Sequence, residues 1–216
     1  MAQIIPFHGT LYNPTTVGDV RKVVAPPYDI IDSTLQKTLH DRHPNNVIRL
    51  ELGYEQPGDT PADNKYLRAA GALKEWLKSG ALRRDDKPAI YYHTIEYQPP
   101  YSAPGTPTKV FKGFLSTVEL EEFGSGKIYP HENTRAAAKT DRFNLLEACR
   151  ANFSAIISLY SDPQNDVLTL IEQSIAADKP RIDFQDDVGF RQRLWSVTDP
   201  AVLAKVVEIM HTKQLF

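Results

Sequence analysis

Prolines divide this chain into short pieces of secondary structure. There are 16 prolines in 216 residues, and many lie in three groups: Pro26-Pro27, between Pro57 and Pro61, and between Pro99 and Pro107. Proline cannot donate a backbone hydrogen bond, and it disfavours helix in the residue before it. Each group therefore predicts a loop with a fixed backbone path, and the helices and strands must fit between these loops.

Composition and charge restrict the class of protein. The 25 basic side chains nearly balance the 27 acidic ones, for a net charge of −2, and 41% of the residues are hydrophobic. These values are typical of a globular chain, and they exclude a disordered chain and one that binds nucleic acid through bulk charge. The single cysteine, Cys149, excludes an internal disulfide and a cysteine-rich metal site.

Targeting signals are absent from the printed sequence. No apolar run approaches the roughly 20 residues that a membrane-spanning helix needs, and Met1 to Phe7 lack the basic-then-apolar order of a signal peptide. We therefore expect a cytoplasmic protein that binds neither a membrane nor nucleic acid.

Helical signals occur in five segments. The last is the clearest, because Asp199 can cap it, Pro200 suits its first position, and apolar side chains from Leu203 to Met210 line one face. Ser33 and Gln36 have the spacing of a capping box at the start of a short helix. The other three predicted helices are residues 62–82, 141–151 and 166–177.

Strand signals lie between these helices. Residues 89–97 and 110–120 are rich in β-forming residues and predict a long hairpin with a proline-rich connection. Residues 46–52 alternate apolar and polar side chains, and residues 155–160 form a short apolar run that predicts a buried strand. Two further short strands are predicted at residues 181–184 and 192–197.

The order of these elements predicts the fold class. Helices and strands interleave without the strict alternation of a doubly wound sheet. We expect an α+β (mixed α/β) fold, with a mixed sheet, a long β-hairpin and about five or six helices. No segment has the composition of a linker, so residues 1–216 are expected to form a single domain.

Familiar nucleotide and metal motifs do not fit. The segment Gly124-Ser125-Gly126-Lys127 lacks the spacing and the Ser or Thr of a phosphate-binding loop, so we interpret it as a turn. His131-Glu132 has no second histidine at helical spacing, and the six histidines are scattered. The sequence therefore predicts no metal site.

Two segments of different character carry candidate site residues. Residues 24–31 contain a proline pair, and residues 46–52 alternate apolar and polar side chains. In residues 24–31, two prolines present Tyr28 and Asp29 rigidly; the structural alternative is a turn in which Asp29 bonds nearby backbone N–H groups. In residues 46–52, the forked guanidinium of Arg49 suits a carboxylate or phosphate. The alternative there is that Arg49 and Glu51 pair on a solvated face.

The third segment, residues 129–142, has the highest concentration of reactive side chains. His131 and Glu132 are candidate acid and base groups, and Lys139, Arg142 and the start of the next helix could hold an anion. The structural alternative is that Thr140 or Asp141 caps this helix while His131 and Glu132 settle a loop.

These segments resemble a family of bacterial and archaeal proteins, the domain of unknown function numbered 1015. The resemblance is carried by VAPPYDII (24–31), NVIRLELG (46–53) and the long segment 129–162. In the last, the family pattern is P-H-E-x-T, then a Lys, Asp-Arg and Ala-Asn-x-Ser. The matching residues are His131, Glu132, Thr134, Lys139, Asp141, Arg142, Asn152 and Ser154. Residues 193–199 and the final helix also look like the family, so the resemblance covers nearly the whole chain.

The resemblance implies a function. Family members are usually longer and continue into an Asp-Gly-His-His-Arg segment, which resembles a signature of the ParB/sulfiredoxin-like superfamily. That superfamily includes kinases that phosphorylate free serine, and family members tend to be encoded near serine-biosynthesis enzymes. This implies the N-terminal part of a nucleotide-dependent small-molecule phosphotransferase, with serine as the candidate acceptor and ATP or ADP with Mg²⁺ as cofactor. Because the signature is absent from this chain, we expect the chain alone to be inactive.

The phosphotransferase hypothesis assigns roles to the candidate residues. Phosphoryl transfer needs cations that stabilise charge, a base near the acceptor hydroxyl and usually Mg²⁺. The catalytic candidates are His131, Glu132 and Asp29. The candidates for binding substrate or phosphate are Tyr28, Arg49, Thr134, Lys139 and Arg142.

The alternative function is a non-catalytic module that binds a small ligand or a partner protein. Tyr28, Tyr54 and Tyr129 would then be contact residues. Convergence of the three segments in one cleft favours the enzyme, and separate flat positions favour the module.

The end of the chain carries one more expectation. The apolar face of the last helix needs a partner surface, and a new apolar run begins at Leu215-Phe216, where the sequence stops. We expect a fragment of a longer protein, with an exposed apolar patch or open sheet edge near Phe216 that a second copy could cover in a homodimer.

Overall fold

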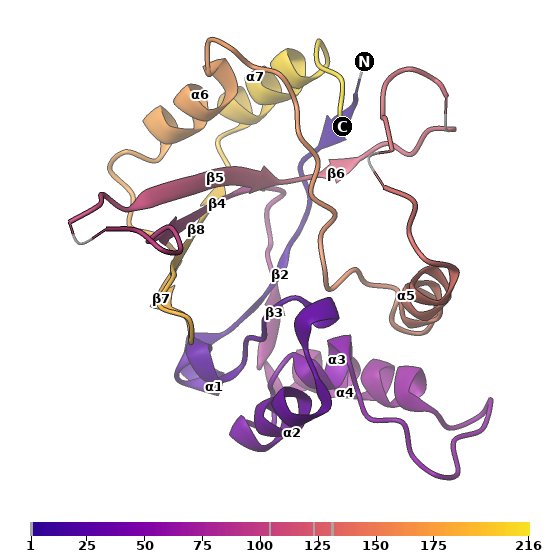
Figure 1. Ribbon diagram of the computed structural model, residues 1–216. Coiled ribbons are helices and arrows are strands. Elements are labelled where there is room, and N and C mark those ends of the chain that lie inside the picture. Colours follow the sequence, from indigo (N-terminus) through magenta and orange to yellow (C-terminus); the bar gives the residue numbers. More distant parts are fainter. Residues whose placement is uncertain (1, 104, 123, 131) are drawn as a thin grey trace. The chain divides into compact units, whose positions relative to one another are not determined.

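The computed structural model describes residues 2–103, 105–122, 124–130 and 132–216, which form two compact units. Unit 1 combines Met1–Gly9, Asp85–His131 and Ile157–Phe216, and unit 2 combines Thr10–Arg84 and Glu132–Ile156. Each unit is assembled from segments that are distant in the sequence, which is why composition shows no linker. Both units contain helices and strands, so the predicted α+β fold class is confirmed (Figure 1). The single domain expected over residues 1–216 stays a prediction.

Unit 1 is built on a four-stranded antiparallel sheet with the strand order β5-β4-β8-β7 (Figure 1). Its strands are β4 (Ile90–Tyr97), β5 (Lys109–Leu115), β7 (Ile182–Gln185) and β8 (Arg191–Val197). β4 and β5 pair along their length, from Tyr91 opposite Leu115 to Tyr97 opposite Lys109. The predicted hairpin and both predicted short strands are therefore confirmed.

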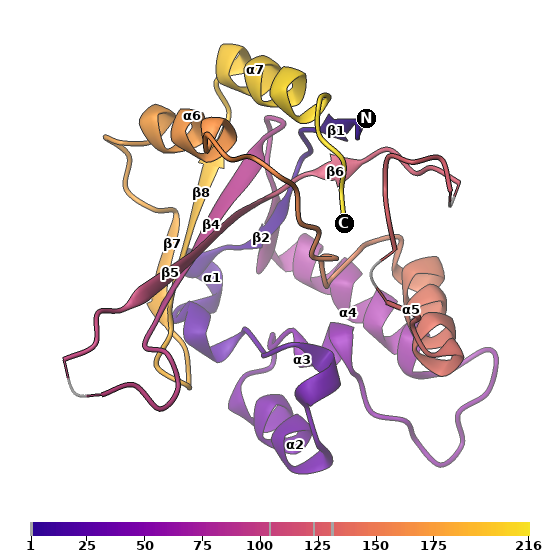
Figure 2. The ribbon, with the colours of Figure 1, turned by 45° about the horizontal axis from the view of Figure 1, so that its top comes forward.

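Two helices, α6 (Asp166–Ser174) and α7 (Pro200–Met210), cover one face of this sheet (Figure 2). Because side chains alternate along a strand, Ile90 and Tyr92 of β4 share the covered face. Both are almost fully buried, and they belong to one core with Ile171 of α6 and Val206 of α7.

The last helix forms as the sequence predicts. Asp199 accepts hydrogen bonds from the N–H groups of Ala201 and Val202, and Pro200 occupies the first turn. These contacts satisfy N–H groups that have no partner inside the helix. The apolar stripe from Leu203 to Met210 packs into the core of unit 1.

Short backbone pairings complete unit 1. β1 (Ile4–Ile5) pairs antiparallel with β6 (Thr117–Val118). Leu215 forms a parallel bridge with Ile128, and Phe216 exchanges two backbone hydrogen bonds, of 2.8 and 2.9 Å, with Leu159. The last two residues therefore pair with a separate segment on each side.

Apolar side chains are exposed around Phe216, as expected. Phe216 itself is 45% exposed, and its ring stacks on that of Tyr129 with 5.3 Å between centroids. Leu159, which pairs with Phe216, is 64% exposed. The homodimer that would cover these side chains stays a prediction.

Unit 2 is mainly helical. α4 (Lys65–Ser79) contacts both α3 (Ile48–Glu51) and α5 (Ala136–Cys149). The remaining elements of unit 2 are β2 (Thr10–Tyr12), α1 (Pro14–Val17), η1 (Val20–Lys22), η2 (Tyr28–Ile30), α2 (Ser33–Arg42) and β3 (Leu82–Arg84), of which β2 and β3 pair antiparallel. Trp76 of α4 and Leu50 of α3 lie in its core.

The strand predicted at residues 46–52 is wrong, because these residues form the one-turn helix α3. The buried side chain of Asn46 accepts a hydrogen bond from Ile48 N–H and donates to the carbonyls of Lys22 and Val24. These bonds hold the chain in a turn at the start of α3. Ile48 and Leu50 are both buried, so the apolar alternation arises from a short helix enclosed on two sides.

The buried strand predicted at residues 155–160 is also wrong. No strand forms there, and Ile156 and Ile157 are 87% and 68% exposed. The chain passes from unit 2 to unit 1 within this segment. Tyr160, at the end of the run, packs against the core of unit 1, whereas the prediction assumed that the whole run is buried.

Two predicted helix starts need correction. α2 is capped by Asp32, whose carboxylate accepts from Leu35 N–H, and not by Ser33. The side chain of Gln36, assigned to a capping box, donates instead to the carbonyl of Leu52. α5 begins at Ala136, so Asp141 lies inside the helix and does not cap it.

Truncation of the unit 1 core should destabilise the protein. Ile171 of α6 is fully buried in the core of unit 1. The Ile171→Ala variant should therefore lower the free energy of unfolding by about 2–5 kcal/mol. Urea denaturation measures this change. Val188→Ala is the matched control, because Val188 is 73% exposed and its truncation should change stability by less than about 0.5 kcal/mol. Equal losses in both variants would contradict the core assignment.

Candidate functional site

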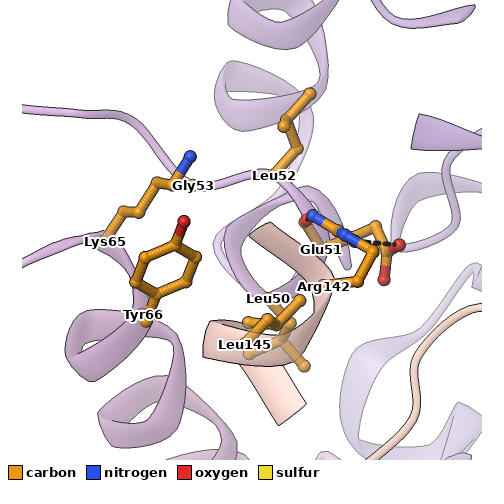
Figure 3. A pocket seen from close by; sticks show the side chains of 8 residues that line it. All are labelled: Leu50, Glu51, Leu52, Gly53, Lys65, Tyr66, Arg142 and Leu145. Carbon is orange, nitrogen blue, oxygen red and sulfur yellow. Dashed lines mark hydrogen bonds and ion pairs between the residues drawn. The ribbon is translucent and has the colours of Figure 1, made fainter. Parts of the chain in front are cut away.

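Arg142 of α5 lies at the centre of a polar cluster in unit 2 (Figure 3). Its Nη1 donates to Oε1 of Glu51 at 2.7 Å, and its Nη2 donates to the backbone carbonyl of Glu51 at 2.9 Å. Its guanidinium also lies over the ring of Tyr28, 4.1 Å from the centroid, which is a cation–π contact. Part of each of the three segments singled out in the sequence therefore meets at Arg142.

Local backbone structure positions Tyr28. Pro26 and Pro27 lead into the single turn η2, in which the N–H of Ile30 bonds to the carbonyl of Pro27. The Tyr28 ring is half-buried under Arg142, whereas Asp29 is exposed. The proline pair thus presents the ring and leaves the neighbouring carboxylate in solvent.

Helix α3 positions Glu51. The residue is only 5% exposed, which is rare for a carboxylate unless it is paired. Its Oε1 accepts hydrogen bonds from Arg142 and from the hydroxyl of Ser154, the latter at 2.6 Å. Its Oε2 is buried and has no hydrogen-bond partner among the described residues. Half of this buried carboxylate is therefore unsatisfied.

A second carboxylate, Asp141, connects α5 to α4. It accepts from Arg142 at 2.5 Å, from the hydroxyl of Tyr66 at 2.8 Å, and pairs with the ammonium of Lys65 at 2.9 Å. Burial raises the pKa of Asp141, but these hydrogen bonds outweigh burial and lower the pKa to about 2. Asp141 is therefore charged at neutral pH.

A small hollow opens between these elements (Figure 3). Lys65 and Tyr66 of α4 lie on one side of it, and Glu51 and Arg142, joined by their ion pair, lie on another. Its lining residues are Leu50, Glu51, Leu52, Gly53, Lys65, Tyr66, Arg142 and Leu145. Its volume is about 10 Å³, and a cavity of roughly 10–15 Å³ holds one water molecule. The hollow therefore admits one group of the size of water.

The charges of the cluster are mostly paired. Lys65 contacts Glu55 at 3.0 Å as well as Asp141, and despite burial these carboxylates raise the pKa of Lys65. Among the residues that the structure describes, these connected ion pairs contain three carboxylates, from Glu51, Glu55 and Asp141, and two cations. Because both cations already contact carboxylates, a phosphate would have to compete with these partners.

The other predicted site residues that the structure describes are not gathered at this cluster. Glu132, Thr134 and Lys139 are exposed, and the Thr134 hydroxyl donates to Glu132. Arg49 donates to the carbonyl of His40, at 2.8 Å. The predicted role of His131 falls on a residue outside those described. Of the predicted residues that the structure describes, Tyr28 and Arg142 are the two that meet at this cluster.

Sequence reasoning missed three members of the cluster: Glu51, Lys65 and Tyr66. Alternation along a strand predicts Glu51 as the partner of Arg49 on a solvated face, but Glu51 is buried and pairs with Arg142. Lys65 and Tyr66 begin α4, where they look like ordinary first-turn residues. The available signal was Asn46, because asparagine is depleted in strands and favours turns.

Within the described ranges, no group of three or more His, Cys, Asp or Glu side chains could hold a metal ion. Among the same residues, no helix combines the length and the apolar character needed to cross a bilayer.

Comparison with known proteins identifies a family. A family model described as "Protein of unknown function (DUF1015)" matches residues 4–216. The chain belongs to this family. No curated protein and no solved structure matches the chain. The DUF1015 match therefore confirms the resemblance seen in the sequence, and the chemistry must be argued from the site itself.

The Asp141→Asn variant should lose part of the acid dependence of stability. The pKa of Asp141 is about 2 in the folded protein and near 4 in an unfolded chain. Its stabilising contribution is therefore complete above about pH 4 and is lost as the pH falls from about 4 to about 2. Free energies of unfolding from urea denaturation at about pH 6 and about pH 3 should differ less in Asp141→Asn than in the unchanged protein.

Glu55→Gln is the matched control for this measurement. Glu55 pairs with the same lysine, but its side chain is 78% exposed, so its loss should cost at most about 1 kcal/mol. An unchanged pH dependence in Asp141→Asn would contradict the assigned role of the carboxylate.

Proposed function

We propose that unit 2 binds a small polar molecule at the hollow beside Glu51 and Arg142. The observation that supports this proposal is Glu51, a residue of the hollow's lining whose buried Oε2 has no partner among the described residues. An unpaired buried acceptor costs about 1–3 kcal/mol, and more when it is charged. A ligand that donates a hydrogen bond to this carboxylate would recover that free energy.

The size of the hollow favours a small donor group. About 10 Å³ accommodates one hydroxyl or amino group, and the rest of such a ligand would lie outside the hollow. A phosphoryl group is larger than this volume. The proposal is therefore a binding module for a hydroxyl- or amino-bearing small molecule, in which Arg142 holds Glu51 in place.

A phosphotransferase is the second candidate function. Its support is that a carboxylate, Glu51, lies in one cluster with two cations, Arg142 and Lys65. Glu51 would accept the proton of the acceptor hydroxyl, and the cations would stabilise transferred charge. Such a reaction also needs ATP or ADP and Mg²⁺, and serine is the acceptor expected from the sequence. Of the two candidate functions, only the phosphotransferase gives a role to three exposed residues: catalysis for Glu132, and binding of substrate or phosphate for Thr134 and Lys139.

Ligand binding should depend on Glu51. A thermal-shift screen of amino- and hydroxyl-bearing metabolites, beginning with serine, should yield compounds that stabilise the protein. For these compounds, calorimetric titration of Glu51→Gln should show binding weaker by about 10- to 100-fold, the loss of one hydrogen bond to a charged group. Glu75→Gln on the exposed side of α4 is the matched control and should bind normally.

Two results separate the candidate functions. Formation of a phosphorylated product from serine, Mg²⁺ and ATP or ADP, detected by mass spectrometry and abolished in Glu51→Gln, would support the phosphotransferase. Because the chain alone is expected to be inactive, the assay uses a full-length member of the family, and absence of both nucleotide binding and turnover there would reject the phosphotransferase. A screen without hits, or hits that bind Glu51→Gln as tightly as the unchanged protein, would reject the binding module.

A further inference from the structure

We infer that copies of this chain dock on one another through two oppositely charged surfaces, the outer face of α5 and an acidic segment that follows β6. Three residues, Lys139, Phe143 and Leu146, define the α5 face, because their spacing of four and three positions places them on one side of the helix. All three are exposed, Phe143 by 62% and Leu146 by 41%. Leu145, on another side of the helix, is buried. The α5 face is therefore a side that the fold leaves uncovered.

Positive charge predominates at the α5 face. Arg135 and Arg150 cap the two ends of α5, and with Lys139 they place three exposed cations on the face or beside it. None of the three forms an ion pair with another described residue. The exposed carboxylate among the described residues of α5 is Glu147, so cations outnumber carboxylates on this side. A partner that fits the face must carry carboxylates around an apolar side chain.

The residues directly after β6 have this chemistry. They are Glu119, Leu120, Glu121 and Glu122, which we call the acidic segment. The side chain of Leu120 is 94% exposed. Glu121 pairs with Lys127 at 2.7 Å, whereas Glu119 and Glu122 are exposed and form no ion pair among the described residues. An apolar side chain between carboxylates is thus the complement of an apolar pair between cations.

A second copy is the partner that supplies this complement. Every copy carries one acidic segment and one α5 face, so two copies can make the contact twice about a two-fold axis, and contacts in one direction link copies into longer assemblies. The charges guide the encounter, while covering Phe143, Leu146 and Leu120 removes apolar surface from water. A bilayer fits less well, because two apolar side chains form a face too narrow to enter it. Both surfaces are distinct from the exposed side chains around Phe216.

The experiment measures self-association of the full chain by sedimentation velocity over a wide range of protein concentration. The unchanged chain should form dimers or longer assemblies as its concentration rises, and added sodium chloride should weaken them by screening the charges. One variant, Arg135→Glu/Lys139→Glu, makes the α5 face acidic, and a second, Glu119→Lys/Glu122→Lys, makes the acidic segment basic. Each variant alone should raise the dissociation constant at least about 10-fold, because like charges then meet.

Mixing the two variants gives the sharpest result. The basic segment of one variant then meets the acidic helix face of the other, and the remaining contact keeps its original charges. The mixture should therefore associate about as tightly as the unchanged chain, and native mass spectrometry identifies mixed assemblies because the variants differ in mass. A role of these residues in folding alone would give no such rescue. Lys74→Glu, the same charge change at an exposed position on α4, is the matched control and should associate normally.

Three results would overturn the inference. The first is a chain that stays monomeric at every concentration, including one whose α5 face binds phosphatidylserine vesicles instead. The second is a mixture that associates no better than either variant alone, although circular dichroism shows both variants to be folded. The third is normal association of both charge variants together with loss of association in Leu159→Glu, which would assign self-association to the side chains around Phe216.

Discussion

The guanidinium of Arg142 is the contact on which unit 2 depends. Its donors reach the side chain and backbone of Glu51, its neighbour Asp141 accepts from it, and the ring of Tyr28 lies against its flat face. Arginine suits this position because its planar fork can donate in several directions while its face stacks on an aromatic ring. A lysine at this position could supply the charge, but its ammonium group has no planar fork of donors and no flat face to lie against an aromatic ring. One side chain thereby fixes η2, α3 and α5 relative to one another inside unit 2.

The parts of the fold that the sequence predicted well are those governed by local periodicity. The hairpin of β4 and β5 follows from β-rich runs separated by prolines, and α7 follows from Asp199, Pro200 and its apolar stripe. Both elements face one continuous core, so the pattern of burial matches the pattern of residues. The strand predicted at residues 46–52 is wrong because a contact that is distant in sequence decides the local conformation. The side chain of Asn46 donates hydrogen bonds to the carbonyls of Lys22 and Val24. Periodicity within seven residues carries no information on such a bond.

The candidate site was predicted in part, for the same reason. Residue types and proline positions singled out Tyr28 and Arg142, which the structure brings into contact, and their role in binding substrate or phosphate stays a prediction. Glu51 was assigned to a solvated face, because alternation along an assumed strand places it opposite the apolar residues. Once α3 is a helix, that face turns into unit 2 and Glu51 becomes buried. An error in one local conformation therefore moved the most unusual carboxylate of the chain from the interior to the surface.

The interleaving of the two units has a consequence for synthesis on the ribosome. The hairpin of β4 and β5 is complete when residue 115 has emerged, but α6 and α7, which cover Ile90 and Tyr92, come some fifty to ninety-five residues later. Unit 2 must likewise wait for α5 before Arg142 can reach Glu51. At roughly 5–20 residues per second, an apolar sheet face stays uncovered for several seconds in each nascent chain. That interval is when the growing polypeptide is most exposed to aggregation and most in need of a chaperone.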